Sequence, residues 1–269
     1  MRLTLLPFGP LALGLLGCGS GGLTRHEPAA PPARDDTAPR DTSDTSRPRD
    51  SAPPEDTAPP APCPADMALV GAACMDLYEA PNRAGAPPLV MYTFDEAVAW
   101  CAAHGKRLCL DREWLAACEG AAGLAYPYGD THEPGVCNDE ETWRVYDQDL
   151  LNLWPWDVSG PGIESLEALL EAAAGTAGGA QAATHVSALY QGEGGGENPG
   201  CAGEAGVFDL VGNVEEWTRR ADGGSASFHG SLKGRYWAES RTCQSAVTTH
   251  GDGFRFYEIG FRCCQDAGR

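Results

Sequence analysis

The sequence predicts an α+β domain that is loop-rich, held together by disulfides and preceded by a disordered tether. Short apolar runs of strand length, together with two well-capped helical segments, indicate the mixed class. The chain has 269 residues, including 34 glycines, 21 prolines and 11 cysteines. Glycine and proline favour loops, and so many cysteines are typical of exported proteins, in which disulfides can form.

The first 17 residues have the features of a signal peptide. Arg2 precedes an apolar run over residues 3–16, which is too short to span a bilayer, and Leu15-Leu16-Gly17 leads into Cys18. Leu-Leu-Gly-Cys resembles the lipobox of bacterial lipoproteins, whose cysteine is acylated. The resemblance implies a lipid anchor at Cys18 and a place in the bacterial cell envelope, and Gly19 favours the outer membrane. An ordinary signal peptide with a chance cysteine is the alternative.

Residues 18–62 are predicted to be a disordered linker. They are rich in Pro, Ala, Asp, Thr and Ser, and Asp-Thr-Ala-Pro occurs twice, at 36–39 and 56–59. The segment has too few large apolar side chains to offset the entropy lost on ordering, and proline keeps such a chain extended. The folded domain is therefore expected over residues 63–269, lifted off the membrane by this stalk.

The charge of the chain limits its partners. The net charge is −19, with 38 acidic and 19 basic residues, and 30 of the acidic and 13 of the basic ones lie at or after Cys63. The acidity therefore belongs to the predicted domain. Such a surface repels nucleic acid, so we expect no nucleic-acid partner, whereas it is compatible with cation binding.

Two strands and a helix are predicted at the start of the domain. Met67–Val70 and Cys74–Ala80 are strand-like runs, and Cys63 and Cys74 flank the hairpin and could pair across it. Thr93 and Glu96 have the spacing of a capping box, and Gly105 ends the helix that follows. Its predicted inner face consists of Ala97, Val98, Cys101 and Ala102.

A second helix is expected to begin at Asp111 as N-cap and to end at Gly120. Its predicted apolar side consists of Trp114, Leu115 and Cys118. Lys106 and Arg107, in the link between the helices, are expected to pair with carboxylates inside the fold. Binding of a substrate anion is the alternative.

Residues 136–200 are mostly loop by composition, with one predicted helix that ends at Gly175. The helix would bury one face, formed by Ile163, Leu166, Leu169 and Leu170. The stretch 192–196 is predicted to be flexible. Three tryptophans are expected to pack the segment down, with an aromatic ligand pocket as the alternative; they are Trp143, Trp154 and Trp156.

A Gly-Asn turn places two carboxylates close together in residues 208–217, which read Phe-Asp-Leu-Val-Gly-Asn-Val-Glu-Glu-Trp. Gly212 and Asn213 tolerate positive φ, so a tight turn can aim Asp209, Glu216 and the carbonyls between them at one point. Ca²⁺ prefers oxygen ligands of this kind. A polar turn beside a buried tryptophan, with no ion, is the alternative.

Four segments, in order, resemble the formylglycine-generating enzyme (sulfatase-modifying factor) family. Residues 210–217 are similar to its Gly-Asn-Val-Trp-Glu-Trp signature, and residues 95–114 (DEAVAWCAAHGKRLCLDREW) to its DAxxYCxWxGKRLPTEAEWE motif. Tyr126–Gly129 (YPYG) is similar to its YPWG, and Gly260–Cys263 to its closing GFRC. The order of the four motifs makes the resemblance specific.

The resemblance implies an irregular fold related to C-type lectins, in which residues 136–200 are an insertion. It also implies a structural Ca²⁺, held by the side chains of Asp209 and Glu216 and by the backbone carbonyls of Gly212 and Val214. Asn138 is a further candidate ligand.

Disulfides implied by the resemblance join the first helix to the last strand and the second helix to the segment before that strand. These two are Cys101–Cys263 and Cys118–Cys243. One arrangement of the remaining cysteines, among the very many that ten cysteines permit, is Cys63–Cys74, Cys137–Cys201 and Cys109–Cys264. With Cys18 acylated, this arrangement leaves no free thiol.

Formylglycine-generating enzymes oxidise a substrate cysteine to an aldehyde, using two cysteines that hold copper shortly after an Arg-Gly-Gly-Ser strand. The matching strand here begins at His229, and the two cysteine places fall near Gly234 and Glu239. Because Cu(I) needs soft thiolate ligands, copper is not expected.

The sequence therefore favours a diverged or non-catalytic binding module on the cell surface, with a peptide, protein or glycan as its ligand. Three alternatives stay open. They are a formylglycine-generating oxidase, an iron site formed by His229, Glu239 and His250, and a purely structural envelope protein.

Overall fold

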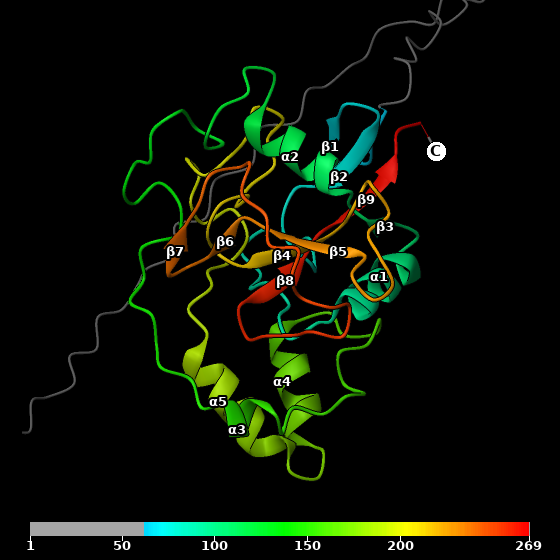
Figure 1. Cartoon of the computed structure of the whole chain (residues 1–269), viewed down its shortest axis with the longest axis vertical. Helices are drawn as coiled ribbons and strands as arrows, with labels where there is room; N and C mark the ends of the chain where they lie inside the picture. Colours follow the sequence, from blue (N-terminus) through cyan, green and yellow to red (C-terminus); the bar gives the residue numbers. More distant parts are fainter. Residues whose placement is uncertain (1–61, 269) are drawn as a thin grey trace, which may run out of the picture. The chain divides into compact units, whose positions relative to one another are not determined.

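The computed structural model describes residues 62–268. Small sheets lie in the middle of this region and short helices surround them (Figure 1). The predicted signal peptide, Cys18 and the linker as far as residue 61 lie outside the described residues. Within 62–268, no helix has the length and apolar character needed to cross a bilayer.

Two sheets carry most of the strands. The first has the order β1-β2-β9-β3, with every pair antiparallel. Its strands are β1 (Met67–Val70), β2 (Ala73–Asp76), β9 (Cys263–Asp266) and β3 (Arg107–Leu108). The second has the order β5-β4-β8, in which β4 pairs with β8 in parallel. Its strands are β5 (Gly230–Lys233), β4 (Glu215–Arg219) and β8 (Ile259–Phe261).

A third, two-stranded sheet joins β6 (Arg235–Tyr236) to β7 (Glu239–Ser240). Strands β8 and β9 are separated only by Arg262, so the closing segment of the chain runs from the second sheet directly into the first. This segment brings the two sheets together around one arginine.

The predicted first hairpin forms, but its second strand is shorter than expected. It ends at Asp76 rather than Ala80. The backbone groups after Asp76 form hydrogen bonds within a turn and with a distant segment instead of with a neighbouring strand. The Tyr78 amide donates to Oδ1 of Asn82 at 3.1 Å. The carbonyl of Leu77 accepts from the amide of Phe208 at 2.9 Å.

Helix α1 (Phe94–Ala103) begins with the predicted capping box: Thr93 Oγ1 accepts from the Glu96 amide, and the Glu96 carboxylate accepts from the Thr93 amide. Its inner face differs from the prediction. Trp100 is buried, whereas Ala102 is exposed and Val98 is half-buried. The bulkier tryptophan takes the core side, because its ring packs on Phe261 of β8.

Helix α2 (Asp111–Glu119) begins one residue earlier than predicted, with Leu110 as N-cap. The Glu113 carboxylate accepts from the Leu110 amide at 2.9 Å and also binds the Arg107 guanidinium at 2.7 Å. Lys106 lies 2.5 Å from Asp76 Oδ1. The two basic residues therefore pair with carboxylates of the fold, as predicted.

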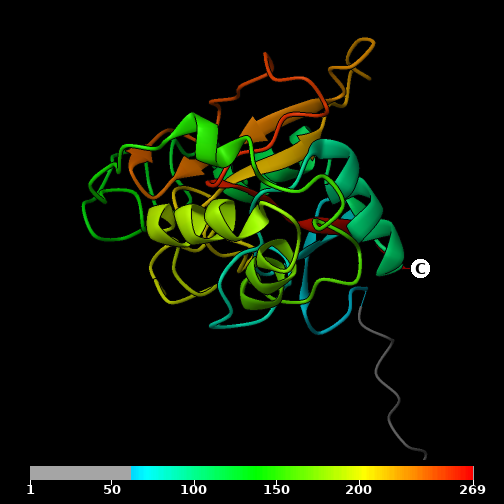
Figure 2. The same ribbon diagram turned by 90° about the horizontal axis from the view of Figure 1, so that it is seen from below.

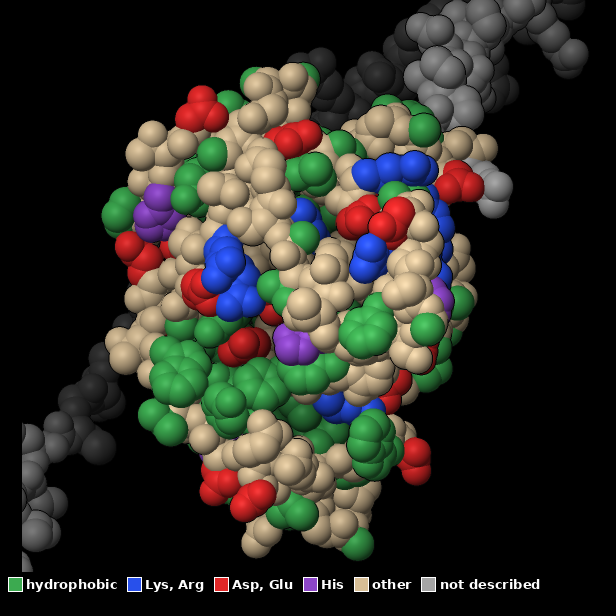
Figure 3. Space-filling model, viewed as in Figure 1, with side chains coloured by type: hydrophobic (Ala, Val, Ile, Leu, Met, Phe, Trp, Pro, Cys, Tyr) green, Lys and Arg blue, Asp and Glu red, His purple; other side chains and the backbone are tan. Residues whose placement is uncertain are grey.

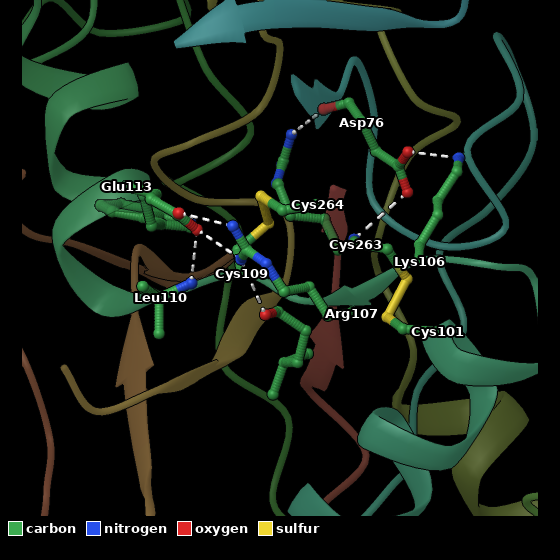
Figure 4. The surroundings of a disulfide bond; sticks show 12 residues. Asp76, Cys101, Lys106, Arg107, Cys109, Leu110, Glu113, Cys263 and Cys264 are labelled. Atoms are coloured by element: carbon green, nitrogen blue, oxygen red, sulfur yellow. Dashed lines mark hydrogen bonds and ion pairs between the residues drawn. A yellow bond between two sulfur atoms is a disulfide. The ribbon is translucent and has the colours of Figure 1, made fainter. Parts of the chain in front are cut away.

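Five disulfides join the described residues, and they are the five pairs set out above. They are Cys63–Cys74, Cys101–Cys263, Cys109–Cys264, Cys118–Cys243 and Cys137–Cys201. Adjacent cysteines of β9 bond to different elements, Cys263 to α1 and Cys264 to the turn before α2 (Figure 4). Disulfides therefore link the last strand to α1 and to the turn that precedes α2.

The predicted insertion contains three helices rather than one. They are α3 (Gln148–Leu151), α4 (Leu166–Ala174) and α5 (Gly179–Leu189). Helices α4 and α5 pack against each other and lie on one side of the sheets (Figure 2). Helix α4 buries Leu166 and Leu169 and ends at Gly175, as the periodicity predicts.

Two further expectations for this segment were wrong in part. Trp154 is buried, but Trp143 and Trp156 are 46% and 72% exposed, so they do not pack the segment down. Residues 192–196 are bonded rather than loose: Gly195 exchanges backbone hydrogen bonds with Gly85 and Ala86. An ideal Cβ on Gly195 would lie 2.9 Å from Tyr78, so this close contact requires glycine.

Candidate functional site

The Gly-Asn turn has the tight geometry that its sequence predicts. Asp209, Gly212 and Asn213 have φ values of 58°, 75° and 52°. An ideal Cβ on Gly212 would lie 2.3 Å from the carbonyl oxygen of Asn138, so only glycine fits. The same carbonyl accepts from the Asn213 amide at 2.7 Å. The turn is thus held against the start of the insertion.

Glu216 is buried in the second sheet and bound by arginine. Arg262 Nη2 and Nε lie 2.6 Å and 2.7 Å from its two carboxylate oxygens, and Trp114 Nε1 donates to one of them at 3.2 Å. Arg262 was not singled out as a site residue, although it is the arginine of the GFRC motif. Its guanidinium takes most of the acceptor capacity of Glu216.

Two more buried carboxylates lie near this pair. Glu79 Oε1 accepts from the Asn213 side chain at 2.9 Å, whereas its Oε2 has no hydrogen-bond partner. Asp209 Oδ2 accepts from the Gly196 amide at 2.7 Å. Burial raises the pKa of Asp209 to about 6, and burial together with the charge of Asp209 raises the pKa of Glu79. The negative charge of these buried carboxylates is therefore not fully compensated by neighbouring positive groups.

The balance of charges at the turn fits a divalent cation. Glu79, Asp209 and Glu216 interact with each other and with Arg262, which gives three carboxylates against one guanidinium. No three His, Cys, Asp or Glu side chains in residues 62–268 form a metal-binding group. A calcium ion here would therefore depend on backbone carbonyls, such as those of Gly212 and Val214, as well as on Asp209.

The places that correspond to the oxidase cysteines lie in the third sheet and the turn before it. Gly234 has φ 85°, and an ideal Cβ there would lie 2.8 Å from the Leu210 carbonyl. Glu239 in β7 binds Arg235 and Arg241. All ten cysteines of the described region are in disulfides. No thiol pair exists there to bind Cu(I).

The iron alternative receives no geometric support. His229 Nδ1 lies 2.6 Å from Asp252 Oδ2, and the Asp252 carboxylate also accepts from the His229 amide. His250 instead stacks on Phe254, with ring centroids 3.8 Å apart. These two histidines and Glu239 do not form a metal-binding group within residues 62–268.

An aromatic surface crosses the face shown in Figure 3. Hydrophobic side chains gather there in a band between the sheets and the helices of the insertion, next to a group of basic and acidic side chains. Trp143, Tyr146 and Trp156 are exposed there: the Tyr146 ring contacts those of Trp143 and Phe256, and Phe256 and Trp156 line one cavity. Beside it is a cavity of about 320 Å³, lined by α3, Trp154, Trp156 and residues 253–256. Its volume lies at the lower end of the range of about 300–1,000 Å³ that is typical of ligand pockets.

The fold and the turn define a sulfatase-modifying-factor-type domain. Residues 76–267 match the family described as sulfatase-modifying factor enzyme 1-like domain (FGE-sulfatase). The match extends over well more than half of the chain, and the chain belongs to this family.

The chain is similar to two proteins called "Inactive C-alpha-formylglycine-generating enzyme 2". The Bos taurus protein is 27% identical over 190 residues, which cover 68% of this chain and 51% of that protein. The Mus musculus protein is 26% identical over 190 residues, which cover 68% of this chain and 50% of that protein. The chain thus spans about half the length of these relatives.

Two solved structures were also matched. "Crystal Structure of CarF" has a TM-score of 0.47 and 13% identity, covering 72% of this chain and 86% of that one. "Treponema denticola variable protein 1" has a TM-score of 0.33 and 18% identity, and the match covers 59% of this chain and 46% of that one.

Proposed function

We propose that the domain is a non-catalytic binding module that captures a peptide segment of another protein. The observation that carries this proposal is the use of all ten cysteines of residues 62–268 in disulfides. Oxidation of a substrate cysteine by a copper-dithiol centre needs two free thiols, and this part of the chain supplies none. The names of the two curated relatives, which include the word "inactive", agree with this proposal.

The aromatic surface supports a binding role. Trp143, Tyr146 and Trp156 expose 46%, 37% and 72% of their area, whereas large aromatic side chains are usually more buried. Tryptophan and tyrosine dominate the energetics of binding surfaces, because they bury a large area with few rotatable bonds. A peptide is the partner we favour, because exposed rings beside a cavity of about 320 Å³ suit an extended segment that places one side chain in the cavity.

Two measurements test the proposal. Full-length protein is incubated with copper and a Cys-x-Pro-x-Arg peptide, and the product is probed with an aminooxy reagent. No aldehyde is expected, and its formation would overturn the non-catalytic assignment. The same protein is then applied to an array of random peptides. Binding that is weakened by Trp156→Ala supports the module, and the absence of any bound peptide contradicts it.

We further propose that Ca²⁺ stabilises the Gly-Asn turn, with Asp209 and the Gly212 and Val214 carbonyls as its main ligands. Glu216, whose two oxygens bind Arg262, would supply negative charge and at most its remaining acceptor capacity. The excess of two carboxylates over guanidinium groups near Arg262 supports a divalent ion. Its role would be structural, because the ion would lie among buried residues.

A lipid anchor at Cys18 in the bacterial cell envelope, with residues 18–62 as the linker, is also part of the proposal. Its support is the Leu-Leu-Gly-Cys sequence alone. Labelling of cells with radioactive palmitate should mark the protein, and Cys18→Ala should abolish the label and release the protein from the membrane fraction. An unlabelled wild-type protein would contradict the anchor.

A further inference from the structure

The cavity beside the aromatic surface, which we call the α3 cavity, is formed by segments that are far apart in the sequence. Helix α3 and the segment after it belong to the predicted insertion, and residues 253–256 lie in the segment before β8. Six of its ten lining residues are apolar and four of these are aromatic. The six are Met91, Leu151, Trp154, Trp156, Phe254 and Phe256.

The polar atoms of the cavity walls are bonded to other protein groups. Trp154 Nε1 donates to Ser159 Oγ at 3.4 Å, and Ser159 Oγ donates to the Met91 carbonyl at 2.8 Å. Two polar side chains of α3 bind each other, since Gln148 Nε2 donates to Asn152 Oδ1 at 2.9 Å. The walls therefore present mainly carbon atoms and ring faces to a ligand.

Arg255 is the one charged residue among those that line the cavity in the described region. Its guanidinium carbon lies 4.9 Å from the centre of the Trp156 ring, and Nη2 lies 3.0 Å from Glu96 Oε1. A lysine or arginine side chain in the cavity would lie close to this like charge, and a carboxylate would compete with Glu96 for the same guanidinium. A neutral side chain avoids both conflicts.

The arrangement of the rings favours an aromatic side chain among the neutral ones. Phe254 and Phe256 lie nearly parallel, at 15° with centroids 6.0 Å apart, and Tyr146 meets Phe256 edge to face at 5.0 Å. Contact between aromatic rings contributes free energy beyond that of the area buried. Because Arg255 and the neighbouring rings already hold these walls in place, little side-chain freedom is lost when a ligand binds.

Exposed carboxylates lie next to the lining residues in the sequence. Asp147 and Asp149 are on either side of Gln148, and Asp157 follows Trp156. All three aspartates are exposed, and none forms an ion pair within residues 62–268. The chain from Cys63 onward has 30 acidic and 13 basic residues, so this local charge has the same sign as that of the whole domain. Such a surface attracts basic partners.

We propose that the α3 cavity binds the side chain of a phenylalanine or tryptophan in the captured peptide, with lysine or arginine beside it in the peptide; this inference rests on the proposed binding function. The aromatic side chain enters between Trp156 and the pair formed by Phe254 and Phe256. The basic residues stay at the surface, near the exposed aspartates. In this arrangement no charge is buried and no polar atom loses its partner.

The test uses the full-length protein and four capped tripeptides, with binding followed by tryptophan fluorescence and NMR titration. Acetyl-Lys-Phe-Lys-amide is expected to bind at least tenfold more tightly than acetyl-Lys-Ala-Lys-amide and severalfold more tightly than acetyl-Lys-Leu-Lys-amide. Acetyl-Glu-Phe-Glu-amide is expected to bind at least tenfold more weakly than the basic phenylalanine peptide, whose binding should weaken as salt is added. Equal or tighter binding of the alanine, leucine or acidic peptide would overturn the proposal.

Two variants assign the binding to the cavity. Gly253 lines it, and an ideal Cβ there has no atom within 4 Å, so Gly253→Leu adds a side chain to the wall without a clash at Cβ. It should weaken binding of the basic phenylalanine peptide at least tenfold. Trp156→Ala removes a ring that is 72% exposed, and it should abolish the preference for phenylalanine over alanine.

Leu69→Ala is the matched control, because Leu69 is 47% exposed and lines a different cavity, beside α2. It should leave binding unchanged, and urea unfolding verifies that every variant is folded. Unaltered binding by both Gly253→Leu and Trp156→Ala would refute the assignment. If the peptide array yields bound peptides that share no aromatic residue beside a basic one, the binding module stands and this inference fails. If the array yields no bound peptide, both fail.

Discussion

Glu216 and Arg262 form a buried, two-point ion pair where β8 gives way to β9. The Nη2–Oε1 and Nε–Oε2 distances are 2.6 Å and 2.7 Å, and the side chains are 1% and 0% exposed. Arg262 also donates to the carbonyls of Asp76, Leu77 and Phe208. One guanidinium therefore joins the first hairpin, the Gly-Asn turn and the closing strand, and its hydrogen bonds compensate for its removal from water.

Arg262→Met should destabilise the protein strongly, because it leaves Glu216 buried without its counter-charge. Loss of one partner of such a pair costs about 3–5 kcal/mol. Urea unfolding followed by tryptophan fluorescence measures the change. Arg220→Met is the control: Arg220 pairs with Asp222 at the surface, and its removal should leave the urea midpoint unchanged. Equal midpoints for Arg262→Met and wild type would show that the pair is not a structural centre.

Local patterns predicted local structure well. The Thr93–Glu96 capping box, the Gly175 helix end and the positive φ at Gly212 each depend on a few neighbouring residues, and the structure has all three. The resemblance of four motifs led to the family, which the match over residues 76–267 shows.

Features that depend on distant parts of the chain were missed. Trp100, rather than Ala102, lies on the inner face of α1 because its ring packs against Phe261. Helical periodicity alone does not contain that information. Helix α5 is rich in alanine and has no strong apolar stripe, so its packing on α4 is what fixes it. Arg262 and Glu216 are likewise 46 positions apart in the sequence, and the pairing of β4 with β8 brings them together.

Calcium should raise the thermal stability of the protein if the Gly-Asn turn binds it. An ion that binds only the folded state adds about 2.7 kcal/mol when its concentration is one hundred times Kd. Scanning calorimetry with Ca²⁺ and with EGTA should show a higher midpoint with Ca²⁺, and Asp209→Asn should reduce the difference. Mg²⁺, which prefers a smaller and more regular site, should have less effect. Identical midpoints in Ca²⁺ and EGTA would exclude the ion.

The long-range disulfide Cys109–Cys264 should contribute more stability than the local Cys63–Cys74. The sequence separations are 155 and 11 residues. In the chain-entropy account, a loop of more than a hundred residues corresponds to about 4–5 kcal/mol, and one of some fifteen residues to about 3 kcal/mol. The double variants Cys109→Ala/Cys264→Ala and Cys63→Ala/Cys74→Ala are compared by urea unfolding without reductant. A larger loss from the second variant would contradict this order.

Glu258→Gln should stabilise the protein relative to wild type more strongly as the pH rises. The pKa of Glu258 is raised from 4.5 to about 8 in the folded state, so the folded protein binds this proton more tightly than the unfolded chain does. The contribution of Glu258 to stability therefore falls between about pH 4.5 and pH 8, by at most about 1.4 kcal/mol per pH unit. Glutamine does not ionise and escapes this loss. Urea unfolding at pH 5, 6, 7 and 8 measures the difference, which should grow with pH and level off above pH 8. A constant difference for Glu258→Gln across this pH range would mean that this carboxyl ionises normally in the fold.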